Sequence, residues 1–217
     1  MQKVYFVSGL GADERVFQFL ELPGVEKVFV QWLPPAPHEP LRAYCRRLLA
    51  QLDLSGEINL VGISFGGIVC QEIARLVPCR RVLLISSIKN PREMDWKLRL
   101  VARSRTHRVV PGWLLKWSNL LTANYYFGTE TPAEAALLRQ IIQDTDQDFM
   151  RWAIAEIMAW SCPVPLPGLA HVHGGRDRIF PAAPVQNATI LAGAGHFMAV
   201  NRAAAVSAFI ARELARA

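Results

Sequence analysis

Cysteine is scarce in this chain of 217 residues, and no two cysteines stand close together. The four thiols belong to Cys45, Cys70, Cys79 and Cys162, and none forms a C-x-x-C pair. This usage predicts free thiols in a reducing compartment. Cys70 is the best placed of the four to act as a nucleophile, but it falls within a predicted helix with no electropositive neighbour to lower its pKa.

Charge and long apolar runs are also limited. Charged residues make up 19% of the chain and hydrophobic residues 52%, too little charge for disorder and enough apolar material for a large core. No apolar run approaches the ~18 residues that a membrane span requires. The chain starts basic and then apolar, like a signal peptide, but the apolar part stops at Ser8, short of the roughly 7–15 residues of an h-region. We therefore expect a cytoplasmic protein with no stable membrane insertion.

The charge that is present is mostly positive, with a formal net charge of +6 and a pI of about 9.5. Basic residues gather in one stretch, offset only by Glu93 and Asp95: Arg92, Lys97, Arg99, Arg103, Arg105 and Arg108. Such a stretch is typical of a solvated helix face, and it is also compatible with attraction of an anionic substrate or a membrane surface. No recognised binding motif accompanies the charge, so we expect no nucleic-acid partner.

Short apolar segments alternate with amphipathic ones along most of the chain. The apolar segments predict strands over 3–7, 27–32, 57–63, 81–85, 169–173 and 189–191. The amphipathic segments predict helices over 12–20, 41–52, 66–76 and 203–215. Continuously apolar strands that alternate with helices indicate an α/β fold, in which helices cover both faces of a parallel sheet.

The alternation breaks between Lys89 and Leu166. This stretch holds five of the six tryptophans, and its periodic segments 133–143 and 149–160 predict helices. We interpret 89–166 as a helical insertion in the sheet topology, within a single domain that spans 1–217.

A G-x-S-x-G pattern stands where the third predicted strand turns into a helix. Ser64 is its central residue, flanked by Gly62 and Gly66. A serine held on a sharp strand-to-helix turn has strained backbone angles, and small residues two positions away avoid a collision. The turn also places the Phe65 N–H at a helix N-terminus, where it can donate to an oxyanion. The alternative is an ordinary glycine-rich turn between a strand and a helix.

A second glycine-rich loop, Ser8-Gly9-Leu10-Gly11, ends the first predicted strand. In a parallel sheet it lies at the same edge as Ser64, so the Leu10 N–H can point at the same oxyanion. Two such donors would account for a large share of catalysis, because losing one typically costs ~10²–10³ in rate. The alternative is a turn with no role.

An acid and a base follow in the order expected for a hydrolase triad. Asp177 lies in the turn after the predicted strand 169–173, and His196 lies in a glycine-rich loop after the last strand. The order Ser, Asp, His distinguishes this arrangement from the triads of other folds. His171 and His173 share one strand at i, i+2, but no third ligand is near, so we predict no metal site.

These motifs, from Gly9 to His196, resemble the α/β-hydrolase superfamily. The resemblance implies that Leu10 and Phe65 are the oxyanion-hole donors and that the insertion is a cap over the site. The chain begins at what resembles the family's third strand, so about six mainly parallel strands are expected instead of eight. Ser8 stands where family members often have histidine. Glu93 and Asp95 follow the strand 81–85, an alternative location for the acid, but neither sits at the strand end.

The function implied is that of a serine hydrolase. It would cleave a carboxylic ester or thioester of a small or medium acyl group through an acyl-enzyme, with a small-molecule substrate and no cofactor or metal. Two alternatives are a lyase that uses the same triad and a non-catalytic ligand-binding member of the fold. The sequence sets no oligomeric state.

Overall fold

Six parallel strands form the sheet at the centre of the protein, in the order β2-β1-β3-β4-β5-β6. The computed structural model describes residues 1–95, 112–162, 166 and 168–216, and for 112–119 the backbone alone. The strands are β1 (Gln2–Val7), β2 (Val25–Val30), β3 (Ile58–Ile63), β4 (Cys79–Ile85), β5 (Ala170–Gly174) and β6 (Thr189–Leu191). The predicted six-stranded parallel sheet is confirmed.

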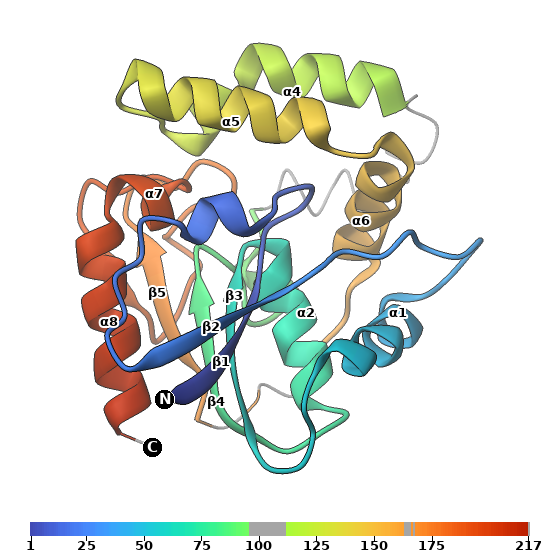
Figure 1. Ribbon diagram of the computed structural model, residues 1–217. Helices are drawn as coiled ribbons and strands as arrows, with labels where there is room; N and C mark the ends of the chain where they lie inside the picture. Colours follow the sequence, from blue (N-terminus) through green and yellow to red (C-terminus); the bar gives the residue numbers. More distant parts are fainter. Residues whose placement is uncertain (96–111, 163–165, 167, 217) are drawn as a thin grey trace.

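Alternation of side chains along the strands creates a core on each face of the sheet. In β1, Tyr5 and Val7 pack against helices α1 (Leu41–Leu48) and α2 (Phe65–Ala74). Val4 and Phe6 point to the other face, which α7 (Met198–Asn201) and α8 (Ala203–Ala215) cover. Figure 1 shows α8 on one side of the sheet and α1 and α2 on the other. Every residue of β3 is buried, because this strand lies between two neighbours and under helices on both faces.

Two of the predicted helices are shorter than expected. The segment predicted as a helix over 12–20 contains a single 3₁₀ turn, η1 (Glu14–Phe17). The Asp13 carboxylate caps this turn by accepting from the Arg15 N–H, and Val16 and Phe17 are buried after it. The apolar spacing that predicted a helix therefore comes from three buried side chains, Val16, Phe17 and Leu20, in and just after one 3₁₀ turn. Helix α1 likewise ends at Leu48 and continues as the 3₁₀ turn η2 (Leu49–Gln51).

Helices lie between β4 and β5 in the chain, where the insertion is predicted. After η3 (Pro91–Glu93) come α4 (Gly112–Phe127), α5 (Pro132–Asp144) and α6 (Gln147–Ala159). Figure 1 shows α4 and α5 across the top of the sheet, above the ends of its strands. We call α4, α5 and α6 with their connections the cap. The basic residues from Lys97 to Arg108 lie outside the described residues.

Two predictions from composition can be compared with this fold. The four cysteines are unpaired, as predicted. Within the described ranges, no helix is both long and apolar enough to cross a membrane.

Candidate active site

Ser64 occupies a strained turn between β3 and α2. Its φ of 53° and ψ of −120° lie outside the regions that residues with a side chain normally adopt. Hydrogen bonds on both sides hold this conformation. The Ser64 N–H donates to the Ile85 carbonyl at 3.0 Å, and the Ser64 carbonyl accepts from the Ser87 hydroxyl at 2.7 Å. The neighbouring strand β4 and the segment directly after it thus fix the turn that presents Ser64.

The glycines around Ser64 are required by space. A Cβ on Gly62 would lie 2.5 Å from the carbonyl oxygen of Gly66, within the turn itself. A Cβ on Gly66 would lie 2.2 Å from the carbonyl oxygens of both Val7 and Ser8. The first conflict is local and could be foreseen from the pattern. The second depends on how closely α2 approaches the end of β1.

His196 and Asp177 form a buried pair. The His196 Nδ1 and the Asp177 Oδ2 lie 2.7 Å apart, and both residues are almost fully buried. The other carboxylate oxygen, Oδ1, accepts from the backbone N–H groups of Ile179 and Phe180 at 2.8 and 2.9 Å. A carboxylate that accepts at Oδ2 leaves the proton on Nδ1, so Nε2 of His196 is the basic nitrogen.

Glu93, the alternative acid, has other partners. Its carboxylate is buried and accepts from the backbone N–H groups of Lys89 at 2.7 Å and Gln186 at 3.2 Å. In the described part of the chain, the carboxylate on His196 Nδ1 belongs to Asp177 and not to Glu93 or Asp95.

The loop after β1 lies directly against Ser64. A Cβ on Gly9 would lie 3.5 Å from the Ser64 Cβ, which is ordinary van der Waals contact. Leu10 follows in this loop and lines the same cavity as Ser64 and His196. Phe65 is the first residue of α2, so its N–H has no partner within the helix. The backbone donors predicted at Leu10 and Phe65 therefore belong to segments that adjoin Ser64.

Two further histidines lie behind the acid. His173 donates from Nε2 to the Phe180 carbonyl at 2.7 Å, and its Nδ1 accepts from His171 Nε2 at 3.2 Å. Burial lowers the pKa of His171 to about 2 and also lowers the pKa of His173, so both rings are neutral. Across the described residues, no group of three His, Cys, Asp or Glu side chains could hold a metal ion. His173 supports the loop that carries Asp177, through its hydrogen bond to the Phe180 carbonyl.

A cavity of about 350 Å³ adjoins Ser64. Ser64, His196 and Leu10 line it on the side of the sheet, and apolar side chains of the cap, such as Ile141 and Met158, line it on the other. None of the described lining residues is Asp, Glu, Lys or Arg. The cavity therefore suits an uncharged, largely apolar group, because a charged one would lose its hydration without gaining an opposite charge.

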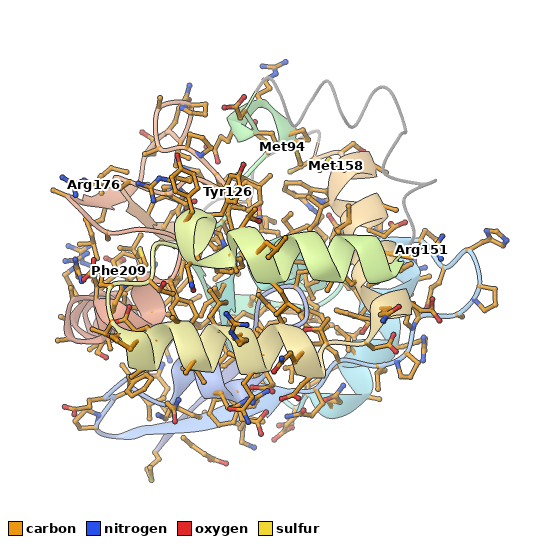
Figure 2. The ribbon with its side chains drawn as sticks, turned by 90° about the horizontal axis from the view of Figure 1, so that it is seen from above. Met94, Tyr126, Arg151, Met158, Arg176 and Phe209 are labelled. Atoms are coloured by element: carbon orange, nitrogen blue, oxygen red, sulfur yellow. The ribbon has the colours of Figure 1, made fainter. Side chains whose placement is uncertain are left out.

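The view from above shows where two arginines lie relative to three of the residues that line this cavity (Figure 2). In Figure 2, Met94, Tyr126 and Met158, which all line the cavity, lie close to one another. Arg151 and Arg176 lie toward opposite edges of the molecule.

Cys70, the alternative nucleophile, is unreactive, since burial raises the pKa of its thiol well above the ordinary value.

A sequence profile described as the alpha/beta hydrolase family matches residues 4–209. The chain belongs to this family. The predicted resemblance is thus confirmed, and it extends over nearly the whole of this α/β hydrolase. No curated protein matches the sequence.

Solved structures similar to this α/β hydrolase include two esterases and a lactonase. An esterase from Thermogutta terrifontis is 19% identical, with 100% of this chain and 90% of the other covered and a TM-score of 0.65. An esterase from Exiguobacterium antarcticum is 14% identical, with 97% and 90% covered and a TM-score of 0.71. The enol-lactonase from Burkholderia xenovorans LB400 is 18% identical, with 99% and 91% covered and a TM-score of 0.68. At these identities the likeness establishes the fold.

Proposed function

We propose that this α/β hydrolase is a serine esterase or thioesterase that works through an acyl-enzyme intermediate. The observation that carries the proposal is the His196–Asp177 pair, 2.7 Å apart and buried, at the cavity that Ser64 also lines. In this proposal Ser64 is the nucleophile, His196 the general base, and Asp177 the acid that fixes the imidazole. The backbone N–H groups of Leu10 and Phe65 form the oxyanion hole.

Acylation begins when the Ser64 hydroxyl oxygen attacks the substrate carbonyl carbon and His196 Nε2 accepts the hydroxyl proton. The carbonyl oxygen becomes an oxyanion, which the N–H groups of Leu10 and Phe65 and the N-terminal end of α2 stabilise. Collapse of the intermediate breaks the bond to the alcohol or thiol, which leaves with the proton from His196. Water then attacks the acyl-enzyme, with His196 again accepting the proton, and Ser64 is released.

The contact between nucleophile and base must tighten when substrate binds. Among the described residues, Ser64 Oγ and His196 line one cavity without a hydrogen bond between them. Catalytic hydrogen bonds of this kind are often long before substrate binds and shorten in the complex.

The cavity indicates which acyl group the enzyme takes. At about 30 Å³ per non-hydrogen atom, the volume occupied by a water in the liquid, its 350 Å³ holds roughly a dozen such atoms. The lining is apolar and carries no formal charge among the described residues. We infer an uncharged acyl group of small or medium length.

A fluorophosphonate probe, which reacts with activated serines, tests the proposal. We expect the probe to label Ser64 in the wild-type protein and to label nothing in Ser64→Ala. Hydrolysis of p-nitrophenyl hexanoate should fall by ~10⁴–10⁶ in kcat in that variant, because the nucleophile is lost. Ser55→Ala is the matched control, since Ser55 is exposed in the loop before β3, at the opposite end of the strand.

Two outcomes would contradict the assignment. One is a folded wild-type protein that takes up no label and hydrolyses no ester, as expected of a non-catalytic binding protein. The other is a Ser64→Ala variant that keeps more than a tenth of the wild-type esterase activity, which would place the nucleophile elsewhere.

A further inference from the structure

The loop that carries Leu10 is built around a β-turn. The Ala12 N–H donates to the Gly9 carbonyl at 3.0 Å, and Gly11 has a left-handed φ of 66°. A positive φ at the third position is the requirement of a type II turn. The turn hydrogen bond uses the Ala12 N–H and leaves the Leu10 N–H outside it. The direction of the Leu10 N–H therefore depends on how firmly the turn Gly9–Ala12 is held.

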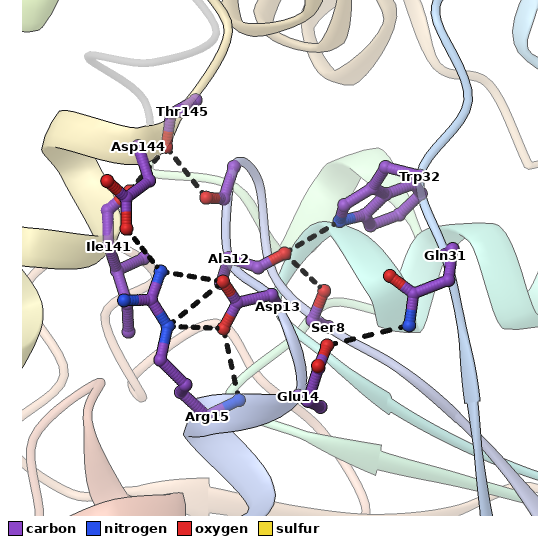
Figure 3. A network of polar contacts seen from close by, with 11 residues as sticks. Ser8, Ala12, Asp13, Glu14, Arg15, Gln31, Trp32, Ile141, Asp144 and Thr145 are labelled. Atoms are coloured by element: carbon purple, nitrogen blue, oxygen red, sulfur yellow. Dashed lines mark hydrogen bonds and ion pairs between the residues drawn. The ribbon is translucent and has the colours of Figure 1, made fainter.

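The body of the protein holds one end of this turn. The Ala12 carbonyl accepts from the Ser8 hydroxyl at 2.6 Å and from the Trp32 indole N–H at 3.0 Å (Figure 3). Both donors follow a strand, with Ser8 directly after β1 and Trp32 two residues after β2. They fix the position of Ala12, but they do not touch Gly11, where the backbone has the greatest freedom.

The cap holds the turn at Gly11. The Gly11 carbonyl accepts from the hydroxyl of Thr145, 134 residues away in sequence, at 2.7 Å (Figure 3). No other group among the described residues donates to this carbonyl. Thr145 directly follows α5 and is nine-tenths buried. A Cβ on Gly11 would lie 2.3 Å from the Thr145 Cγ2 and 2.4 Å from its Oγ1, so the threonine side chain rests on the glycine.

We propose that Thr145 is a positioning residue for the reaction, and that it holds the Gly9–Ala12 turn so that the Leu10 N–H points at the oxyanion. The proposal rests on the proposed function, since it takes Leu10 as an oxyanion donor. The physical reason is that glycine itself imposes no φ, and the contact with Thr145 supplies the missing constraint. A donor stabilises the transition state fully only when its direction is fixed in advance.

An ion pair joins the same two segments but contributes less. The Arg15 guanidinium lies 2.6 Å from the Asp13 carboxylate and 2.8 Å from that of Asp144, the last residue of α5 (Figure 3). More than half of the Asp144 side chain is exposed, so solvent screens this pair. The hydrogen bond from the Thr145 hydroxyl to the Gly11 carbonyl is buried, so solvent weakens it less than it weakens the ion pair.

A simpler role for Thr145 is to complete α5. Its hydroxyl also lies 2.8 Å from the Ile141 carbonyl, four residues earlier in the helix, as threonine hydroxyls near helix ends often do. One hydroxyl proton serves both carbonyls. If the bond to Ile141 were the only useful one, losing the hydroxyl would lower stability and leave the chemical step unchanged. The positioning role instead predicts a loss in kcat.

Thr145→Val separates the two roles, because valine keeps the shape of threonine and loses the hydroxyl. We expect kcat for p-nitrophenyl hexanoate to fall about tenfold, less than the ~10²–10³ for complete loss of a donor, with KM within twofold. Inhibition by an alkyl boronic acid, whose adduct on serine places an oxygen in the oxyanion hole, should weaken by a similar factor. Thr145→Ser, which keeps the hydroxyl, should retain most of the wild-type kcat.

Thr131→Val is the matched control. The Thr131 hydroxyl caps the other end of α5, where it accepts from the Glu134 N–H at 3.2 Å. Its removal should lower Tm and leave kcat and boronic acid affinity unchanged. If Thr145→Val loses its cooperative thermal transition, Thr145→Ala, which cannot overpack the site, is measured in its place with the same expected loss.

The inference is overturned if folded Thr145→Val keeps kcat and boronic acid affinity within twofold of wild type, or if Thr131→Val loses as much kcat. Ser64→Ala, assayed in parallel, distinguishes this failure from failure of the proposed function. An inactive Ser64→Ala beside a fully active Thr145→Val leaves the serine mechanism in place and removes only the role of Thr145. An active Ser64→Ala removes both.

Discussion

Asp177→Asn perturbs the acid by one atom and leaves its shape unchanged. The two oxygens of the Asp177 carboxylate have different partners. Oδ1 accepts from two backbone N–H groups, and among the described residues Oδ2 accepts a hydrogen bond from His196 Nδ1 alone. Asparagine can offer its single oxygen to one side alone. Turning that oxygen toward His196 would leave two buried N–H donors without an acceptor, at about 1–3 kcal/mol each. The oxygen should therefore stay with the two N–H groups.

The consequence for His196 is a change of tautomer. The asparagine NH₂ group then faces Nδ1, which must become an acceptor, and the ring proton moves to Nε2. A protonated Nε2 cannot accept the Ser64 proton. In serine proteases the same substitution lowers kcat by about 10⁴, and we expect a loss of that size here. Stability should change little, because all three hydrogen-bonding positions remain occupied.

The assay is kcat and KM for p-nitrophenyl hexanoate, with urea unfolding of each variant. Glu93→Gln is the matched control, since the Glu93 carboxylate is equally buried but accepts from backbone N–H groups away from His196. This control should keep kcat within a few-fold of wild type. The reasoning is refuted if Asp177→Asn keeps more than a hundredth of wild-type kcat, or if Glu93→Gln loses as much.

Three further predictions follow from packing, burial and the cavity. Gly66→Ala places a methyl group against the carbonyls of Val7 and Ser8. It should lower the free energy of unfolding by about 1–3 kcal/mol, measured by urea unfolding, and abolish esterase activity in the same assay. His171 has a pKa of about 2 in the folded state and stays neutral there, whereas in the unfolded state it is protonated below pH ~6.5. As the pH is lowered below that value, this group should therefore reduce the free energy of unfolding by up to ~1.4 kcal/mol per pH unit. His171→Leu should flatten that slope between pH 6 and pH 4.5; an unchanged slope would contradict the assignment. Finally, at ~30 Å³ per atom the cavity of about 350 Å³ holds roughly a dozen non-hydrogen atoms, so kcat/KM for p-nitrophenyl esters should rise with acyl length and then fall once the acyl group exceeds about that size. A half-ester with a terminal carboxylate should react poorly, and its efficient turnover would contradict an uncharged cavity.

The sequence by itself determined the strands and the residues placed at their ends. Most of the strands contain a short run of apolar residues, and the carboxyl ends of parallel strands lie at the same edge of the sheet. For this reason Ser64, Asp177 and His196 could be grouped from the order of residues alone. The spacing of Val16, Phe17 and Leu20 misled, because apolar side chains buried in and just after a 3₁₀ turn leave the same pattern as a helix.

Only the tertiary structure decided which groups meet across long stretches of chain. The cavity forms because side chains of the cap lie over the sheet. The sequence does not indicate which surface an apolar side chain of the cap faces, so the cavity could not be predicted from it. The hydrogen bond between Thr145 and Gly11 is another example. The local sequence explains Gly11 as a turn glycine and Thr145 as the residue that ends a helix, but it does not indicate that the two residues meet. Short-range preferences fix local conformation, whereas contacts over 134 residues arise only when the whole core packs.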